Sequence, residues 1–185
     1  LEFRTAVFLA QDKQGMEDIR NGVDVHQYTA DIIGCSRQEA KPHTFKPLYG
    51  GMSGTENEKK YYSAFLKKYP DIKAWHEKLQ DEAIRTKVVT LPTGRQYAFP
   101  KAERMPWGGS SSSTQIKNYP VQGFATADIV PLACINIQEL LEEHNTKSLL
   151  INTVHDSIVA DVFPGEERIV ASCLNNGCLG VIQRM

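Results

Sequence analysis

Four side chains recur at intervals of four residues in the first half of the chain: Arg37, Lys41, Phe45 and Tyr49. Four residues turn an α-helix by about 400°, so these side chains stay on one broad helix face. Cations neutralise phosphates, and an aromatic ring stacks on a base or sugar, so the stripe suits a nucleoside triphosphate. An amphipathic helix with buried rings and surface cations explains the same spacing.

A second candidate site lies in the stretch LLINTVHDSIVADV, residues 149–162, where His155 and Asp156 interrupt apolar sequence. The β-branched and apolar residues on both sides predict a β-hairpin with this pair at its turn. A carboxylate there is costly unless the turn exposes it or a cation pairs with it. The sequence leaves both possibilities open. For His155, a purely structural hydrogen bond is the alternative to a role in chemistry.

The elements that must position these residues are predicted from periodicity, caps and breakers, and they indicate an α+β fold. Asp24 is a suitable helix N-cap and Gly34 a suitable helix end. Pro42 and Pro47 are unfavourable inside the helix that bears the stripe, and Pro70 should break or kink a later helix. The predicted segments are helices at 5–35 (in two pieces, broken at 20–24), 37–49, 56–86, 121–143 (bent at Pro131) and from 164 onward, hairpins at 88–100 and 149–162, and an exposed loop at 106–113.

The bulk composition is that of a folded, soluble protein. The 185 residues are 41% hydrophobic and 23% charged, which excludes a disordered chain. No apolar run reaches the ~20 residues that span a bilayer and no secretory signal opens the chain, so we expect no membrane partner and a cytoplasmic location. Four scattered cysteines without a CxxC pair indicate free thiols: Cys35, Cys134, Cys173 and Cys178.

Charge is distributed unevenly although the net charge is only −1. Residues 37–120 hold fifteen Lys and Arg against eight Asp and Glu, whereas residues 1–36 and 121–185 are both acidic. A basic middle between acidic flanks suits a surface for a polyanion beside a surface for cations. Solvated helix faces are the alternative explanation.

The order Arg-x3-Lys-x3-Phe-x3-Tyr-Gly resembles motif B, the fingers O-helix, of family A (polymerase-I-like) DNA polymerases. Other segments resemble the same family in the same order: LEFR the tail of motif A, DVHQYTA the segment that supplies a histidine to the nucleotide, YPDIKAW and TLPTGRQY the later fingers, KNYPVQGFATAD the palm helix along the primer-template, and TVHDSIVADV motif C. The resemblance covers nearly the whole chain, and its ordered motifs are specific together although each is weak alone.

The resemblance implies a site for the incoming deoxynucleotide. Arg37 and Lys41 match the triphosphate ligands, and His26 matches a further phosphate contact. Phe45 matches the ring that packs against the nucleotide, where a Phe goes with discrimination against dideoxynucleotides. Glu2 matches the steric gate that leaves no room for a ribose 2′-hydroxyl; a solvated carboxylate at a helix start is the alternative.

The resemblance also implies contacts with a DNA primer-template. Tyr49 and Gly50 match the end of the O-helix, where the templating base is handled. Asn118 and Gln122 match minor-groove and template contacts, where amide groups address the acceptors common to all base pairs. Arg95, in the predicted TGRQY turn, is expected to contact the DNA backbone.

For catalysis the resemblance implies two magnesium ions, Mg2+, that assemble the primer 3′-hydroxyl and the triphosphate. Asp156 matches the motif C aspartate that binds them, and His155 the motif C histidine near the primer terminus. The second protein ligand, the motif A aspartate, is expected four residues before Leu1. Two departures are Ser157, where many members have Glu, and Thr114, where bacterial relatives often have Arg.

The same resemblance predicts a palm made of residues 1–23 and 105–185, with fingers at 24–104. Both ends look cut, so we expect a fragment of a longer polymerase that is inactive alone. The short segment between residues 50 and 61 and the HDS sequence favour a bacteriophage-type enzyme. If so, its location is the host cytoplasm.

Three alternatives remain open at this stage. A single-subunit RNA polymerase shares the palm, but Glu2 and Phe45 argue against it. A non-catalytic nucleic-acid-binding module could retain the fold, and the residue at the motif A position would discriminate. A domain whose basic stripe is merely solvated predicts that Lys41→Ala leaves nucleotide binding unchanged.

Overall fold

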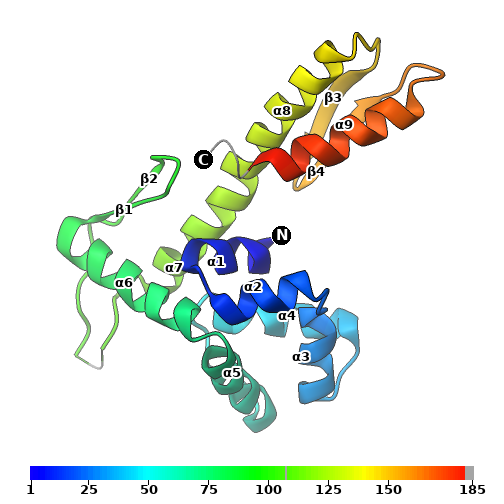
Figure 1. The fold of residues 1–185 in the computed structure, drawn as a ribbon. Coiled ribbons are helices and arrows are strands. Elements are labelled where there is room, and N and C mark those ends of the chain that lie inside the picture. Colours follow the sequence, from blue (N-terminus) through cyan, green and yellow to red (C-terminus); the bar gives the residue numbers. More distant parts are fainter. Residues whose placement is uncertain (107, 182–185) are drawn as a thin grey trace. The chain divides into compact units, whose positions relative to one another are not determined.

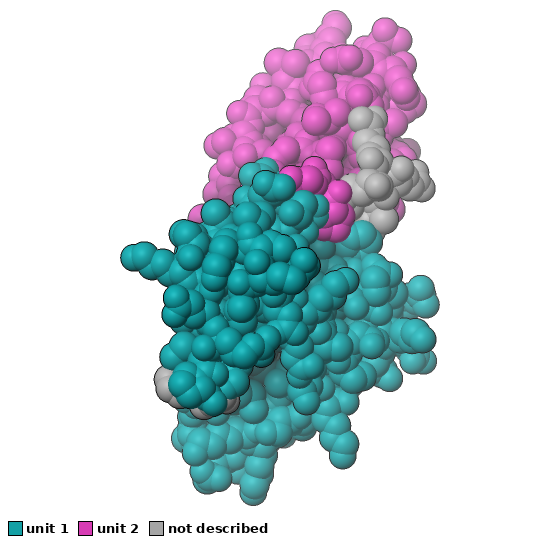
Figure 2. Space-filling view, turned by 90° about the vertical axis from the view of Figure 1, so that its left-hand side faces the viewer, with its two compact units in different colours: residues 1–91, 95–121 teal, residues 92–94, 122–185 magenta. Residues whose placement is uncertain are grey.

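The computed structural model describes residues 1–106 and 108–181, and it confirms the predicted α+β fold (Figure 1). Helices dominate, and the described strands form two separate antiparallel hairpins. The chain divides into two compact units, shown in Figure 2: residues 1–91 with 95–121, and residues 92–94 with 122–185. The predicted division into palm and fingers stays a prediction.

The first unit holds a series of short helices and one hairpin. Its helices are α1 (Glu2–Ala10), α2 (Lys13–Arg20), α3 (Val25–Ile33), α4 (Arg37–Leu48), α5 (Glu56–Lys68), α6 (Pro70–Thr86) and α7 (Ser113–Gln122), whose last residue belongs to the second unit. Its strands are β1 (Val88–Thr90) and β2 (Gln96–Ala98), which pair antiparallel as predicted.

The predicted helical segment at 5–35 contains three helices rather than two. The additional break lies at Gln11, which has a left-handed φ of 53°, and at Asp12. The buried Asp12 carboxylate accepts the amide of Gly15 at 2.8 Å and so caps α2. It also accepts the amides of Asp71 and Ile72, at 3.0 and 3.2 Å, at the start of α6. This long-range role could not be read from periodicity.

The other predicted boundaries in this region are confirmed. Asp24 caps α3 by accepting the amides of His26 and Gln27, and Gly34 ends it with a φ of 81°. Pro70 separates α5 from α6 and occupies the first turn of α6, where its missing amide is tolerated.

Helix α4 runs through both of its prolines without an interruption. A capping box starts it: Ser36 Oγ accepts the amide of Glu39, and the Glu39 carboxylate accepts the amide of Ser36. Pro42 and Pro47 each remove one amide donor from the helix. Because two backbone hydrogen bonds are missing, the cap and the packing of the helix must contribute to its stability.

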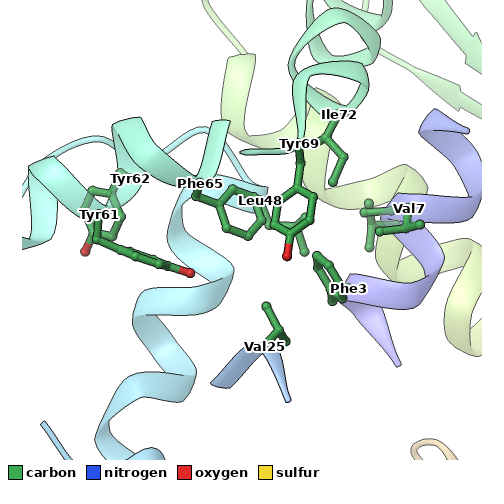
Figure 3. Packing of buried hydrophobic residues seen from close by; sticks show 11 residues of the cluster. Phe3, Val7, Val25, Leu48, Tyr61, Tyr62, Phe65, Tyr69 and Ile72 are labelled. Carbon is green, nitrogen blue, oxygen red and sulfur yellow. The ribbon is translucent and has the colours of Figure 1, made fainter. Parts of the chain in front are cut away.

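An aromatic core fixes α1, α4, α5 and α6 against one another (Figure 3). The Phe65 and Tyr69 ring centroids lie 4.8 Å apart, and those of Phe3 and Tyr69 lie 5.2 Å apart, both edge to face. The Tyr69 hydroxyl donates to Asp18 at 2.8 Å, which satisfies its polar end. The pKa of Tyr69 is raised mainly by burial and further by the Asp18 carboxylate, so the phenol stays neutral. Val25 of α3 and Leu48 of α4 are buried in this core, which holds both helices in place.

The second unit is a long helix followed by a hairpin and a final helix. Its elements are the π-helix η1 (Gly123–Ile129), α8 (Val130–Glu143), β3 (Leu149–Val154), β4 (Ser157–Asp161) and α9 (Glu167–Leu179). The π-helix η1 ends at Ile129, two residues before Pro131, and the bend predicted at this proline stays a prediction.

Two expectations about residues 106–143 are wrong. Helix α7 begins at Ser113, the last residue of the expected loop, rather than at Val121. Ser110 is only 7% exposed, and its amide donates to the Gln80 side chain at 3.1 Å, so the loop is not wholly exposed. Trp107 lies outside the described residues.

One helical stretch among the described residues, Ser113–Glu143, is long and apolar enough to cross a membrane by length and composition alone. Its most apolar 18-residue window has a mean hydropathy of 1.3, contrary to the expectation of no such run, and 44% of that window is buried within the chain. Core helices of soluble proteins meet the same criteria. The four cysteines are free, as predicted.

The predicted hairpin at 149–162 is confirmed, but only one of its faces is buried within this chain. Leu150, Ile158 and Ala160 pack against α8 and α9. Leu149 and Ile151 are 58% and 59% exposed. The apolar sequence therefore does not place the whole hairpin in a core of these residues.

Candidate nucleotide-binding site

A carboxylate at the start of α3 lies beside a guanidinium at the start of α4. Asp24, the cap of α3, accepts a hydrogen bond from Arg37 Nε at 2.7 Å, and both side chains are nearly half exposed. The Arg37 hydrogen bond is the main reason why the pKa of Asp24 lies below its ordinary value. This pair fixes the first residue of α4, the helix that carries the basic and aromatic stripe.

His26 stands on the second residue of α3 and is half-buried against α4. Its Nδ1 lies 3.1 Å from the Thr44 hydroxyl, and its ring meets Phe45 edge to face at 5.5 Å. The pKa of His26 is lowered mainly by burial. The nearby Arg37 and Lys41 lower it further, whereas Asp24 raises it. The imidazole is therefore neutral at pH 7, with two cations close to it.

A cavity of about 320 Å³ opens beside these residues, between the start of α1 and the α2–α3 turn. His26 and Arg37 line it, as do Phe3 and Val25 at its apolar side. Arg4 lines it too, and sequence reasoning missed this residue. The only sequence signal was its place in the LEFR segment. A cavity with two guanidinium groups and an imidazole can bind a polyphosphate.

The rest of the predicted nucleotide residues lie in the same unit. Phe45 and Tyr49 stack with centroids 6.4 Å apart, so the stripe is real and its two rings share one helix face. Lys41 is half-buried one turn before Phe45. Glu2 is the first residue of α1, half-buried, but it is not among the residues that line the cavity.

The end of α4 holds a close contact that the sequence did not reveal. Gly50 has a φ of 80°, and the buried Lys117 side chain of α7 lies where a Cβ on this residue would stand. Only glycine fits both conditions. Burial lowers the pKa of Lys117, and Glu77 opposes the shift. The next residue, Asn118, has a buried Oδ1 without a hydrogen-bond partner among the described residues.

The remaining predicted DNA contacts are at the surface. Arg95 is exposed after the turn between β1 and β2, and Gln122 is exposed at the end of α7. Their exposure is compatible with binding a large partner.

His155 and Asp156 form the two-residue turn between β3 and β4, and both are exposed. Val154 pairs with Ser157 across the turn, and His155 takes a left-handed φ of 55°. The question raised by the apolar flanks is thereby answered: the turn exposes the carboxylate. These two residues belong to the second unit, whereas His26, Arg37 and Lys41 come together within the first.

The described structure is a helix-rich α+β fold in which His26 and Arg37 line one cavity and Lys41 lies near the histidine. The family model of DNA polymerase family A matches residues 1–178, so the chain belongs to this family.

Individual relatives agree with the family assignment. DNA polymerase I of Lactococcus lactis subsp. cremoris is 30% identical over 188 residues, which cover 90% of this chain and 21% of that protein. The DNA polymerase of Mycobacterium phage L5 is 28% identical over 180 residues, which cover 92% of this chain and 28% of that protein. The chain thus spans about a fifth to a quarter of these relatives.

A solved structure shares the fold. The polymerase domain of Pol1 from M. smegmatis, in complex with DNA primer-template and dNTP, has a TM-score of 0.82 and covers 98% of this chain and 35% of that chain. Its sequence identity of 20% supports the fold alone.

Proposed function

We propose that the protein carrying this chain performs template-directed DNA synthesis, in which a nucleotidyl group passes from a dNTP to a primer 3′-hydroxyl. The observation that carries the proposal is the cluster of His26, at the start of α3, with Arg37 and Lys41 of α4. There His26 and Arg37 line one cavity, and Lys41 lies close enough to lower the pKa of the histidine. Membership of DNA polymerase family A supports it.

In this proposal the cluster binds and orients the triphosphate. Arg37 presents a planar fork of donors and Lys41 a point charge, which together neutralise the phosphates. Phe45 packs against the nucleotide, and its edge-to-face contact keeps the His26 ring beside the phosphates. Glu2 excludes the ribose 2′-hydroxyl.

The DNA primer-template would lie along residues that follow the stripe. Tyr49 and Gly50 handle the templating base, and Asn118 and Gln122 address the minor groove. The unpartnered, buried Oδ1 of Asn118 supports this role, since a buried acceptor without a partner is unfavourable until a ligand satisfies it. Arg95 contacts the DNA backbone.

Divalent cations, which we propose are two Mg2+ ions, would be held in part by Asp156. An exposed carboxylate supplies the hard oxygen atoms that such a cation prefers, so the residue fits the role. The described residues contain no group of three or more metal-ligating side chains, so the remaining ligands would come from outside them. The ions would stabilise the charge that develops on the reacting phosphate. His155 would stand beside the primer end.

The further assignments rest on sequence. We propose palm roles for residues 1–23 and 105–185 and fingers roles for 24–104, no membrane partner, and a cytoplasmic location. A bacteriophage-type enzyme is supported by the short segment between residues 50 and 61 and by the similarity to the phage L5 polymerase.

Lys41→Ala in the full-length protein tests the proposal. Loss of one charge-assisted phosphate contact should raise the KM for dNTP roughly tenfold or more. Lys60→Ala is the matched control, because Lys60 is an exposed cation on α5 in the same unit. Single-nucleotide primer extension measures both. Equal KM values for wild type and Lys41→Ala would contradict the proposal and favour a merely solvated stripe.

A further inference from the structure

A chain of hydroxyl groups runs from His26 into the core of the first unit. His26 Nδ1 lies 3.1 Å from Thr44 Oγ1, Thr44 Oγ1 lies 2.8 Å from Thr29 Oγ1, and Thr29 Oγ1 lies 2.7 Å from the Tyr61 hydroxyl. Thr29, Thr44 and Tyr61 are completely buried. None of the three belongs to the predicted nucleotide or DNA contacts.

The lateral contacts exceed what the threonines need for themselves. Each threonine hydroxyl also lies within hydrogen-bond distance of the carbonyl one helical turn earlier, Thr29 of Val25 at 2.7 Å and Thr44 of Ala40 at 3.1 Å. A hydroxyl has a single hydrogen to donate, so for Thr44 the Ala40 carbonyl and His26 Nδ1 are alternative acceptors. Such local bonds are the usual way in which a helical threonine is satisfied. The contacts among the hydroxyl groups therefore connect α3, α4 and α5 and end at His26.

Tyr61, at the inner end of this series of hydroxyl groups, is held rigidly. Tyr61 lies on α5 and packs edge to face on Tyr62 and Phe65 at 5.8 and 6.1 Å. Burial raises the pKa of Tyr61 to about 12, so the hydroxyl keeps its proton at any working pH. A fixed hydroxyl chain can hold the imidazole in one orientation, much as an outer group orients a metal-bound or catalytic histidine.

His26, at the outer end of this series of hydroxyl groups, faces the cavity. His26 lines the cavity together with Arg37, and its Nε2 forms no hydrogen bond within the described part of the chain. In a neutral imidazole only one ring nitrogen carries a hydrogen, so Nε2 can donate to a phosphate oxygen only when Nδ1 accepts the Thr44 hydroxyl. This hydrogen bond would then set both the orientation and the tautomer of the ring. Phe45, the next residue after Thr44, closes the other side of the ring at 5.5 Å.

We propose that Thr44, supported by Thr29 and Tyr61, is a positioning residue that orients His26 so that Nε2 meets a phosphate of the incoming dNTP. The inference rests on the proposed function and assigns a role to residues that contact no substrate themselves. Thr44 acts through His26, so its effect must vanish when the histidine is absent.

The experiment is a double-mutant cycle in the full-length polymerase. Thr44→Val keeps the shape but removes the hydroxyl, and should raise the KM for dNTP roughly 3- to 10-fold with little change in kcat, as expected for one lost positioned hydrogen bond. Thr44→Ser should restore the wild-type KM. In a His26→Ala background, Thr44→Val should cause no further rise.

Two further variants separate positioning from general damage. Thr5→Val is the matched control: Thr5 is 2% exposed in the same unit and its hydroxyl has no partner among the described residues, so KM should stay unchanged. Tyr61→Phe removes only the last hydroxyl and should raise KM by a smaller factor, again only when His26 is present. It also decides the question if Thr44→Val does not fold.

The outcomes are distinguishable from failure of the proposed function. A wild-type protein without primer extension contradicts the proposed function itself. An active wild-type protein whose KM is unchanged by Thr44→Val and by Tyr61→Phe overturns the positioning role. Effects of Thr44→Val that multiply with those of His26→Ala overturn it too, because they show that Thr44 acts independently of the histidine.

Discussion

Two histidines, His26 and His76, pack against α4, and both are kept neutral by their surroundings for the same first reason, burial. His76 is the extreme case at 4% exposure, with a hydrogen bond to the backbone of Leu48 and the positive charge of Lys117 nearby. Its Nε2 has no partner among the described residues. Burial lowers the pKa of His76 to about 3, from an ordinary value of 6.5.

This lowered pKa predicts an acid-sensitive fold. Between pH 6.5 and about 3 the unfolded chain binds a proton on this imidazole that the folded chain does not bind, so the free energy of unfolding falls as the pH falls. The contribution amounts to about 2 kcal/mol on going from pH 7 to pH 5. Urea unfolding at both pH values should show a drop in wild type that exceeds the drop in His76→Leu by about this amount. Equal drops would contradict the assignment.

At the scale of elements, Asp12 joins two helices that are far apart in the sequence. Its carboxylate accepts amides from the first turns of both α2 and α6, and it is completely buried. The same unit contains two capping boxes that act locally, at Ser36 and Thr55. The Asp12 cap instead ties the start of α2 to the start of α6, and Asp71 adds a reciprocal contact by accepting the amide of Lys13 at 3.3 Å.

Asp12→Ala should therefore cost more than the loss of an ordinary N-cap. An N-cap contributes about 1 kcal/mol, and leaving two further buried amides unsatisfied adds about 1 kcal/mol or more each, so we expect a loss of roughly 3 kcal/mol in the free energy of unfolding. Asp12→Asn should lose less, because its oxygen still accepts on one side. Asp31→Ala, which removes an exposed carboxylate on α3, is the control and should change stability by under ~0.5 kcal/mol.

The elements also show how far sequence reasoning reaches. Asp24, Gly34 and Pro70 gave correct boundaries because caps and breakers act through neighbouring backbone. The break at Asp12, the start of α7 at Ser113 and the packing of Lys117 on Gly50 depend on partners tens of residues away. The spacing of the stripe predicted the stacked rings of Phe45 and Tyr49, but nothing local marked Arg4, Thr44 or Tyr61 as neighbours of the site.

For the whole molecule, the two roles that we propose are assigned to different units. The residues that we assign to the triphosphate lie in the first unit, and the carboxylate that we assign to the metal ions lies in the second. Binding and chemistry should then be separable by mutation. The chain spans 21% of the Lactococcus lactis relative, and the proposed reaction is therefore tested in the full-length protein.

Asp156→Asn in the full-length protein should abolish most primer extension, lowering kcat by roughly 10³-fold or more, as for the loss of a group that stabilises transition-state charge. The affinity for dNTP measured without divalent ions should not change, since His26, Arg37 and Lys41 remain intact. Asp161→Asn is the matched control, because Asp161 is an exposed carboxylate on the same hairpin. Residues 1–185 alone should not extend a primer. Robust extension by Asp156→Asn would show that the metal-binding carboxylate has been placed on the wrong residue, whereas robust extension by residues 1–185 alone would contradict the expectation that a further ligand is needed.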